Sequence, residues 1–340
     1  MSAVAANPAA QRLLSRFAWF AVFYNVLAVL WGALVRATGS GAGCGNHWPL
    51  CNGQVIPVSP GFHTVIEFTH RMMTGPGDSV VILAMVLWTF RATARRDAAR
   101  FFAVATTVLL FTEGFLGALL VKLGYVTTNQ SVGRMVVLSI HFSNTLLLLA
   151  ALTLTARFLS RTQHEHAQPW PTLHLARRFA WAVAGLAATI AVGVSGSMAA
   201  LGDTLFPAST LSAAFAQDFA AGSPMLLRLR LIHPASALLA ALFVVWLVLR
   251  SRDRSLQVDP SQTSRTRLAN LVLALLALQI ALGIADVLLL APAWMQLLHL
   301  LGADLYWVAL VLLAAETVWP SPSISAQAIT VETHPAATLA

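Results

Sequence analysis

Charged residues are scarce in this chain of 340 residues, because only 10% of them are Asp, Glu, Lys or Arg. Hydrophobic residues make up 58%, and the mean hydropathy is +0.73. This composition excludes an ordinary soluble domain, which needs more charge to cover its surface. The formal net charge of +8 reflects membrane topology and attraction to anionic lipid. We therefore expect membrane lipid, and no nucleic acid, among the partners.

Short strands of alternating apolar and polar residues, which a membrane β-barrel requires, are also lacking. The apolar runs are instead continuous and close to the ~20 residues of a membrane-spanning helix. The predicted fold class is therefore an all-α integral membrane protein with eight transmembrane helices. They are expected at roughly 16–37, 62–90, 101–123, 134–157, 179–201, 225–249, 268–291 and 293–319.

Lys and Arg are missing from the loops at about 38–61, 124–133 and 202–224, which predicts that these loops face outward. The loops after the second, fourth and sixth segments carry arginine clusters within 91–100, 157–178 and 250–267, so they are expected in the cytoplasm. Arg12 and Arg16 keep the N-terminus on that side. We expect a multi-pass protein of the cell membrane with both termini cytoplasmic. A small-residue cleavage site is lacking, so no cleavable signal peptide is expected.

Four histidines, His70, His141, His233 and His299, fall near the start of the even-numbered segments. The predicted topology places them at one depth, within about two turns of the outer surface. Two imidazoles from facing helices can ligate one haem iron axially, and helix bundles build cofactor sites from such inward-facing side chains. The pattern predicts two haem sites. A hydrogen-bonded core histidine is the alternative for each residue alone, whereas zinc or copper would need further ligands.

The chain has the pattern of a duplication, because the spacing from His70 to His233 nearly equals that from His141 to His299. Gly-Ala-Leu-Val-Arg-Ala-Thr-Gly-Ser-Gly at 32–41 is weakly echoed by Gly-Val-Ser-Gly-Ser-Met at 193–198. Similar internal symmetry occurs in transporters without a cofactor, so it names no function. We predict two tandem, pseudo-symmetric four-helix bundles, residues 1–168 and 169–320, and a disordered cytoplasmic tail over 321–340.

The two predicted halves differ beside their first histidine. Glu67 lies one helical turn before His70, whereas Arg230 occupies the same place before His233. A carboxylate in the hydrocarbon layer is a functional candidate, although pairing with Arg71 is the alternative. Possible partners for haem propionates near the outer surface are Arg71, Arg134 and Arg230. Snorkelling to lipid headgroups would explain these arginines equally well.

Cysteine is nearly absent, because Cys44 and Cys51 in the first outer loop are the only two. An oxidising exterior predicts a disulfide between them. The pattern leaves open whether this bond is a structural staple or a thiol pair that exchanges electrons, and metal binding by His47 with the thiolates is a third alternative. The second half has no cysteine pair in its matching loop, which excludes a second redox pair.

Three stretches together resemble the haem A synthase family: residues 32–44, Trp-Pro-Leu-Cys-Asn-Gly at 48–53 and Glu-Phe-Thr-His-Arg at 67–71. The cysteine loop departs from the commonest family pattern by being longer. The resemblance implies conversion of haem O to haem A, by two successive hydroxylations of the C8 methyl whose hydrated product loses water to give a formyl group. It further implies that oxygen comes from water.

The resemblance also implies roles for individual residues. His70 and His141 would hold the substrate haem O, while His233 and His299 would ligate a permanent haem b that relays electrons. Glu67 matches the essential acidic position of the family. An electron acceptor of unknown identity is implied, and the farnesyltransferase that makes haem O is an expected partner.

Two other interpretations of the sequence remain open. A quinone-linked membrane cytochrome with two b haems would need the four histidines but neither Glu67 nor a disulfide-capped pocket. A transporter or assembly factor whose histidines bind no iron is the other alternative. Inter-helix hydrogen bonding is expected for three further acidic residues in apolar segments, Glu113, Asp286 and Asp304.

Overall fold

The computed structural model describes residues 8–161, 176–252 and 260–319, and this part of the chain is helical apart from its loops. Eight helical segments in it are long and apolar enough to cross a membrane, which confirms the predicted all-α fold with eight spans. The elements are α1 (Pro8–Ala37), α2 (Phe62–Met72), η1 (Met73–Gly77), α3 (Asp78–Ala92), α4 (Ala98–Lys122), α5 (Val132–Leu159), α6 (Ala176–Leu205), α7 (Leu211–Phe219), α8 (Met225–Arg252), α9 (Pro260–Leu288) and α10 (Ala293–Val318).

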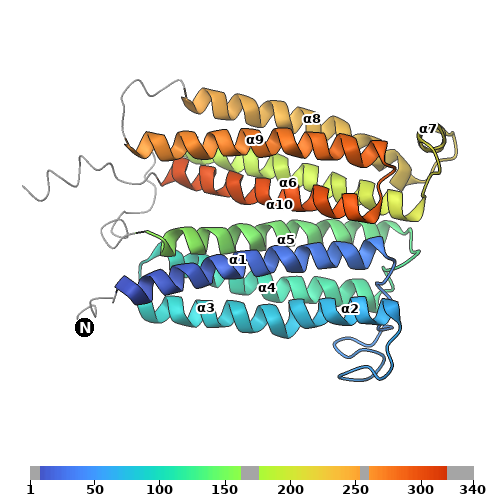
Figure 1. Ribbon diagram of the computed structural model, residues 1–340, viewed down its shortest axis with the longest axis horizontal. Coiled ribbons are helices and arrows are strands. Elements are labelled where there is room, and N and C mark those ends of the chain that lie inside the picture. Colours follow the sequence, from blue (N-terminus) through green and yellow to red (C-terminus); the bar gives the residue numbers. More distant parts are fainter. Residues whose placement is uncertain (1–7, 162–175, 253–259, 320–340) are drawn as a thin grey trace, which may run out of the picture.

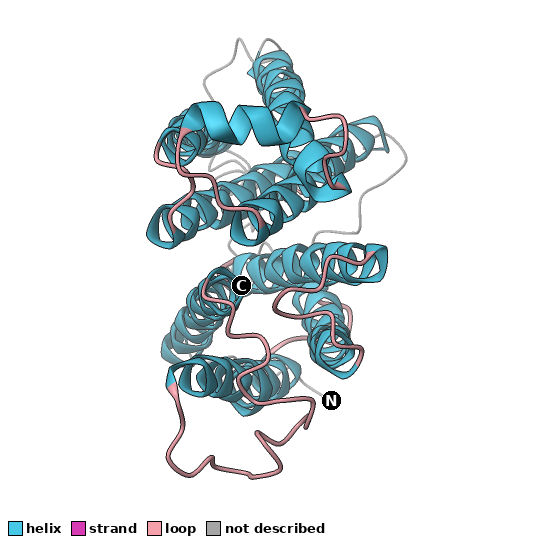
Figure 2. Cartoon of the chain, turned by 90° about the vertical axis from the view of Figure 1, so that its right-hand side faces the viewer, coloured by secondary structure: helices cyan, strands magenta, loops and turns pink. Residues whose placement is uncertain are grey.

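Helices α1 to α5 lie together in the lower part of Figure 1, and α6 to α10 lie in the upper part. The end-on view in Figure 2 shows the same two groups. Where the groups meet, α5 and α1 contact α6 and α10. The predicted boundary at 168/169 and the predicted tail at 321–340 fall outside the described residues, so the division into two domains stays a prediction.

Buried side chains join the two groups of helices. One apolar cluster runs from Leu14 on α1 through Leu149 on α5 to Trp307 on α10. The Trp307 indole Nε1 also donates to the Leu146 carbonyl at 2.8 Å. Inside a bilayer, close packing and such inter-helix hydrogen bonds, rather than exclusion of water, stabilise helix association. The two groups are therefore packed against each other along the middle of the molecule.

The second membrane span is interrupted by a π-helical turn, η1, which the hydropathy pattern did not predict. Pro76 lies inside this turn and has no N–H for the regular helical ladder. The Tyr24 hydroxyl donates to the Met73 carbonyl at 3.2 Å and so supplies a partner for that group. Gly77 leaves room for this hydrogen bond, because a Cβ there would stand 2.1 Å from the Tyr24 hydroxyl oxygen and 3.0 Å from the Met72 carbonyl oxygen. Such π-turns are frequent at functional sites, and this one begins three residues after His70.

The outer segment predicted as a loop at 202–224 contains the short helix α7, which lies beyond the ends of the spanning helices (Figure 1). The Thr210 hydroxyl accepts from the Ala213 amide at 3.1 Å and caps its first turn. α7 carries Asp218, whose contacts matter for the site described below.

Candidate functional site

The four predicted histidines lie on four helices that all begin at the same end of the molecule, on the right in Figure 1. Each lies within three turns of its helix start and is half-buried. They are His70 on α2, His141 on α5, His233 on α8 and His299 on α10. The common depth inferred from the sequence is therefore matched by the helix arrangement.

Each histidine ring faces a glycine on the neighbouring helix. A Cβ placed on Gly32 of α1 would stand 3.0 Å from Cε1 of His70, and one on Gly196 of α6 would stand 2.9 Å from Cε1 of His233. The approach is looser at Gly117 of α4, where the distance to Cε1 of His141 is 3.9 Å, and close again at Gly283 of α9, where the distance to Cε1 of His299 is 3.0 Å. Contacts below 3.4 Å leave no room for a methyl group unless the ring moves.

The glycine contacts repeat between the two halves of the chain. Gly32 and Gly196 lie near the outer ends of α1 and α6, the two helices that carry the weak sequence echo. Gly117 and Gly283 lie on α4 and α9, which precede the helices of the second histidine in each half. A glycine therefore lies against a histidine ring at all four positions, because the missing side chain lets each ring approach the neighbouring helix.

His233 and His299 face each other, with ring centroids 6.4 Å apart and ring planes inclined by 79°. Two imidazoles on opposite sides of one metal ion, with metal–nitrogen bonds of about 2 Å, would have centroids about 6 Å apart. Among the described residues, no ring contact of this kind joins His70 and His141. The structure therefore brings the two rings of the C-terminal pair into contact, whereas the described contacts of His70 and His141 include no such ring pair.

The second ring nitrogen, Nδ1, has a different environment at each histidine. Ser195 Oγ lies 3.1 Å from Nδ1 of His233, and Gln279 Nε2 lies 3.1 Å from Nδ1 of His299. Nδ1 of His141 lies 3.5 Å from a Glu113 carboxylate oxygen without forming a hydrogen bond, and Nδ1 of His70 is buried with no partner in the described part of the chain. A histidine that ligates a metal through one ring nitrogen usually donates the N–H of the other to a nearby acceptor. The groups beside Nδ1 would therefore affect how the rings bind a metal.

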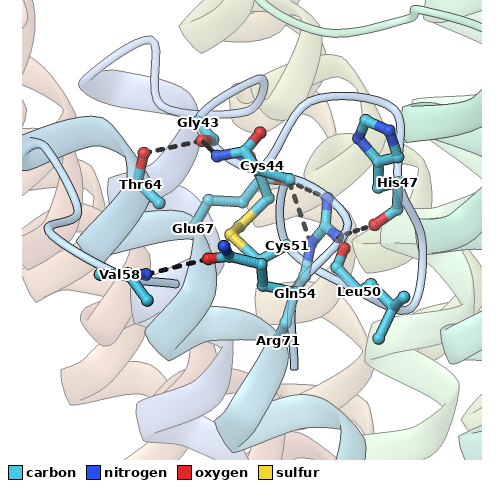
Figure 3. Close-up of a disulfide and its surroundings, with 11 residues drawn as sticks. Gly43, Cys44, His47, Leu50, Cys51, Gln54, Val58, Thr64, Glu67 and Arg71 are labelled. Carbon is cyan, nitrogen blue, oxygen red and sulfur yellow. Dashed lines mark hydrogen bonds and ion pairs between the residues drawn. A yellow bond between two sulfur atoms is a disulfide. The ribbon is translucent and has the colours of Figure 1, made fainter. Parts of the chain in front are cut away.

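Glu67 is only 3% exposed and forms an ion pair with Arg71, which was the alternative considered for this carboxylate. Its second oxygen accepts from the Cys44 amide at 2.7 Å. Arg71 Nη1 also donates to the carbonyls of His47 and Leu50, at 2.8 and 2.6 Å. Figure 3 shows these groups around the disulfide. The Glu67–Arg71 pair therefore attaches the first outer loop to α2.

Cys44 and Cys51 form the predicted disulfide, and both residues are buried. Since both sulfur atoms are in this bond, they are not thiolate ligands for a metal with His47. The described residues also contain no group of three or more His, Cys, Asp and Glu side chains placed to hold a metal ion. Any metal at the membrane histidines would have to be held by pairs of rings.

Arg230 is neutralised by two carboxylates, which changes the contrast drawn from the sequence. Its Nη1 donates to Asp203 and its Nε donates to Asp218 of α7, both at 2.9 Å. The carboxylate beside His70 and the cation beside His233 lie where the sequence indicated, but Glu67 and Arg230 are both paired, so neither is a lone charge. The sequence missed this because Asp218 belongs to an outer segment that only the fold brings to α8.

Two further arginines lie at the end of the helices that carries the histidines. Arg134 Nη1 donates to the carbonyls of Thr127 and Asn129, both at 2.7 Å. The sequence patterns gave no role to Arg36, which is hydrogen-bonded to three groups of the other half. Its Nη1 donates to the Ala200 carbonyl and the Thr204 hydroxyl and its Nη2 to the Gln296 side chain, all at 2.7 Å. This link could not be found from a local signal, since its partners are more than 160 residues away.

Hydrogen bonding between helices, expected for three acidic residues, occurs at Glu113, which accepts from Asn144 Nδ2 at 2.6 Å and from the Thr145 hydroxyl. For Asp286 and Asp304 the expectation is not met in full. Asp286 Oδ1 and Asp304 Oδ2 are buried and have no hydrogen-bond partner among the described residues. We have no physical account of these two oxygens.

Comparison with known proteins identifies related sequences over most of the chain. The sequence model of the COX15-CtaA family, described as cytochrome oxidase assembly protein, matches residues 15–311. A protein of Thermus thermophilus named protoheme IX farnesyltransferase is 41% identical over 315 residues, which are 92% of this chain and 49% of that protein. A heme A synthase of Shouchella clausii is 38% identical over 146 residues, 43% of this chain and 46% of that protein. The chain thus spans about half the length of the curated relatives it matches.

Proposed function

Because this chain belongs to the COX15-CtaA family of cytochrome oxidase assembly proteins, we propose that it is a haem A synthase, an oxidoreductase that converts the C8 methyl of haem O to a formyl group. The single observation that carries this proposal is the facing pair His233 and His299, with ring centroids 6.4 Å apart. The sequence repeat extends the same arrangement to His70 and His141.

The residues present fit a haem at each pair. The glycines let the rings of His233 and His299 lie close against the neighbouring helices, and Nδ1 of each ring has a polar neighbour. Nε2 is the ligating atom in this proposal, which requires the Gln279 amide, 3.3 Å from Nε2 of His299, to turn toward Nδ1. His233 and His299 would hold haem b, which supplies one-electron transfer when bound. His70 and His141 would hold haem O, the substrate. Arg71, Arg134 and Arg230 lie at the same end and are proposed partners for propionates, although each already donates to protein oxygens.

The reaction balances with water as the oxygen source. Each hydroxylation adds one oxygen from water to the methyl carbon at C8 and releases two protons and two electrons. After the second, the hydrated carbon loses water, so that CH₃ and one net water become CHO with four protons and four electrons. His233 and His299 would hold the haem that passes these electrons on, and the final oxidant would be of the membrane quinone or one-electron carrier class.

We assign Glu67 the role of accepting a proton or stabilising positive charge near the C8 carbon. Its position one turn from His70 supports this role. Arg71 and the Cys44 amide hold both of its oxygens, so the same contacts that attach the outer loop fix the carboxylate in place. Such fixed charge is effective because it needs no rearrangement during the reaction.

The name of the Thermus relative favours a second candidate, transfer of a farnesyl group to protohaem IX. Its identity extends over 92% of this chain, but half of that protein has no counterpart here. The relatives named heme A synthase also match, over less than half of this chain. We therefore propose that the farnesyltransferase reaction, which makes haem O, belongs to a partner that delivers the substrate.

The test is haem extraction and a pyridine haemochrome spectrum of the purified protein, made alone and then co-expressed with a haem O source. A synthase should contain haem b alone in the first case, with haem O and haem A appearing in the second. Two haem b per chain and no haem A in either case would indicate an electron-transfer cytochrome. Formation of haem O from protohaem and farnesyl diphosphate by the purified chain would establish the transferase, and a colourless protein would favour a transporter or assembly factor.

A further inference from the structure

We propose that Glu113 and Gln279 are positioning residues that make the two haem sites electronically unequal. Glu113 of α4 presents a carboxylate to the iron ligand His141, and Gln279 of α9 presents a neutral amide to the iron ligand His299. The proposal rests on the proposed function in one respect, that both histidine pairs bind haem. It adds a direction for electron flow that the histidines alone do not specify.

Glu113 is held in place by two donors from the helix that carries His141. Asn144 Nδ2 donates to Oε2 at 2.6 Å, and the Thr145 hydroxyl donates to Oε1. Oε1 also lies 3.5 Å from Nδ1 of His141, and Nδ1 has no other partner among the described residues. Asn144 is fixed in turn, because the Thr112 hydroxyl donates to its Oδ1 at 2.7 Å. The carboxylate therefore has an acceptor oxygen close to Nδ1 of His141, which has no hydrogen-bond partner among the described residues.

Gln279 occupies the corresponding position in the second half. Glu113 precedes Gly117 by four residues, and Gln279 precedes Gly283 by four residues, so each lies one turn from the glycine that its histidine ring faces. The Gln279 amide nitrogen is 3.1 Å from Nδ1 and 3.3 Å from Nε2 of His299, so it lies beside both ring nitrogens. When Nε2 binds iron, Nδ1 carries the proton and must donate it to an acceptor. The Gln279 side chain supplies that acceptor if its amide group is flipped, so that the oxygen rather than the nitrogen faces Nδ1.

The charge of the acceptor decides how strongly the ring donates electrons to iron. An N–H that donates to a carboxylate makes the imidazole a more basic ligand, which stabilises ferric iron and lowers the midpoint potential. A neutral amide has a weaker effect. The N-terminal site should therefore have the lower potential for a given haem, and electrons released at the substrate should move toward the C-terminal site.

The groups beside Nδ1 of His70 and His233 do not show the same difference between a carboxylate and a neutral group. Ser195, a neutral hydroxyl, faces Nδ1 of His233, and Nδ1 of His70 has no partner in the described part of the chain. Glu67 lies close to His70 in sequence, but its oxygens are bonded to Arg71 and Cys44. Glu113 is thus the carboxylate that the described structure directs at a histidine ring.

The test is a spectroelectrochemical titration of the purified, haem-loaded protein, together with the EPR spectrum of its ferric form. Two reduction waves are expected, and His141→Ala identifies the N-terminal wave by removing it. Glu113→Gln should raise the midpoint of that wave, change its EPR signal and weaken haem retention at that site about tenfold. Gln279→Glu places a carboxylate beside His299 and should lower the midpoint potential of the C-terminal wave. Glu316→Gln, a buried carboxyl at the opposite end of α10, is the matched control and should shift neither.

Each outcome decides the proposal. Shifts of opposite sign confined to the predicted waves support it, and Gln279→Glu alone suffices if Glu113→Gln does not fold. Unchanged waves and EPR signals in both variants overturn it, even if the parent protein makes haem A. Haem in both sites with the predicted shifts but no haem A would remove only the proposed synthase function. A parent protein that binds no haem overturns both proposals.

Discussion

Gly283 on α9 and His299 on α10 are so close that a Cβ on the glycine would stand 3.0 Å from the ring carbon Cε1. The same relationship joins Gly196 to His233 and Gly32 to His70. A ring held against backbone has few alternative rotamers, because the neighbouring helix itself is the obstacle. Orientation of the histidines therefore depends on residues that carry no functional group.

Alanine at Gly196 or Gly283 should displace the facing ring and weaken haem binding at the C-terminal pair. Overpacking of this kind costs about 1 to 3 kcal/mol, which corresponds to a loss of affinity of about fivefold to a hundredfold. Haem content per folded protein, from the pyridine haemochrome, measures the effect. Gly114→Ala is the control, because nothing lies within 4 Å of a Cβ at that helical position. Full haem content in Gly196→Ala and Gly283→Ala would show that the rings are not fixed by the glycines.

Glu67→Gln should leave haem content unchanged and lower haem A formation by about 100-fold or more, the usual contribution of a group that moves a proton. The amide keeps the shape of the side chain but loses the charge paired with Arg71. Haem A formed per haem bound, in cells that supply haem O, is the quantity to compare. Glu316→Gln breaks another buried ion pair, with Arg157, and should retain activity. If Glu67→Gln makes haem A as fast as the parent, the catalytic role is wrong.

Replacing Cys44 and Cys51 together with serine should destabilise the first outer loop without stopping the reaction. The bond closes a loop of about eight residues, for which chain entropy predicts a loss of about 2.5 kcal/mol. Thermal unfolding in detergent, followed by haem absorbance, measures the change. Haem A formed per folded molecule at low temperature should stay near the parent value, since we take the bond to be a staple. A folded double variant with no turnover would instead indicate a redox role.

Arg36→Met should destabilise the contact between the two groups of helices. The substitution leaves the Ala200 carbonyl, the Thr204 hydroxyl and Gln296 without their donor. Buried hydrogen bonds to a charged group make this a loss on the order of 3 kcal/mol. The melting temperature in detergent reports it, with Arg16→Met as control because Arg16 is exposed on the same helix. Equal melting temperatures would mean that Arg36 does not hold the groups together.

Much of the fold was accessible from the sequence because a bilayer imposes simple rules. Long apolar runs must form helices to satisfy their backbone groups, so the eight spans agree with the structure apart from their ends. The π-turn at Met73–Gly77 and helix α7 were missed. Pro76 lies in the short polar stretch Thr-Gly-Pro-Gly-Asp-Ser at 74–79, which an average over the whole segment conceals. α7 is short and lies outside the spans, so hydropathy gives no signal for it.

The candidate site, like the fold, could be predicted from the sequence only in part. The sequence by itself determined which residues could be ligands, because four histidines recur at one position of the membrane-spanning pattern and two cysteines share one loop. Only the tertiary structure decided their surroundings: which glycine each ring faces, that Arg230 is paired with Asp203 and Asp218, and that Glu113 faces His141 where Gln279 faces His299. Helix periodicity fixes a residue's depth and face, but partners on other helices depend on how those helices pack, and that information is distributed over the whole chain.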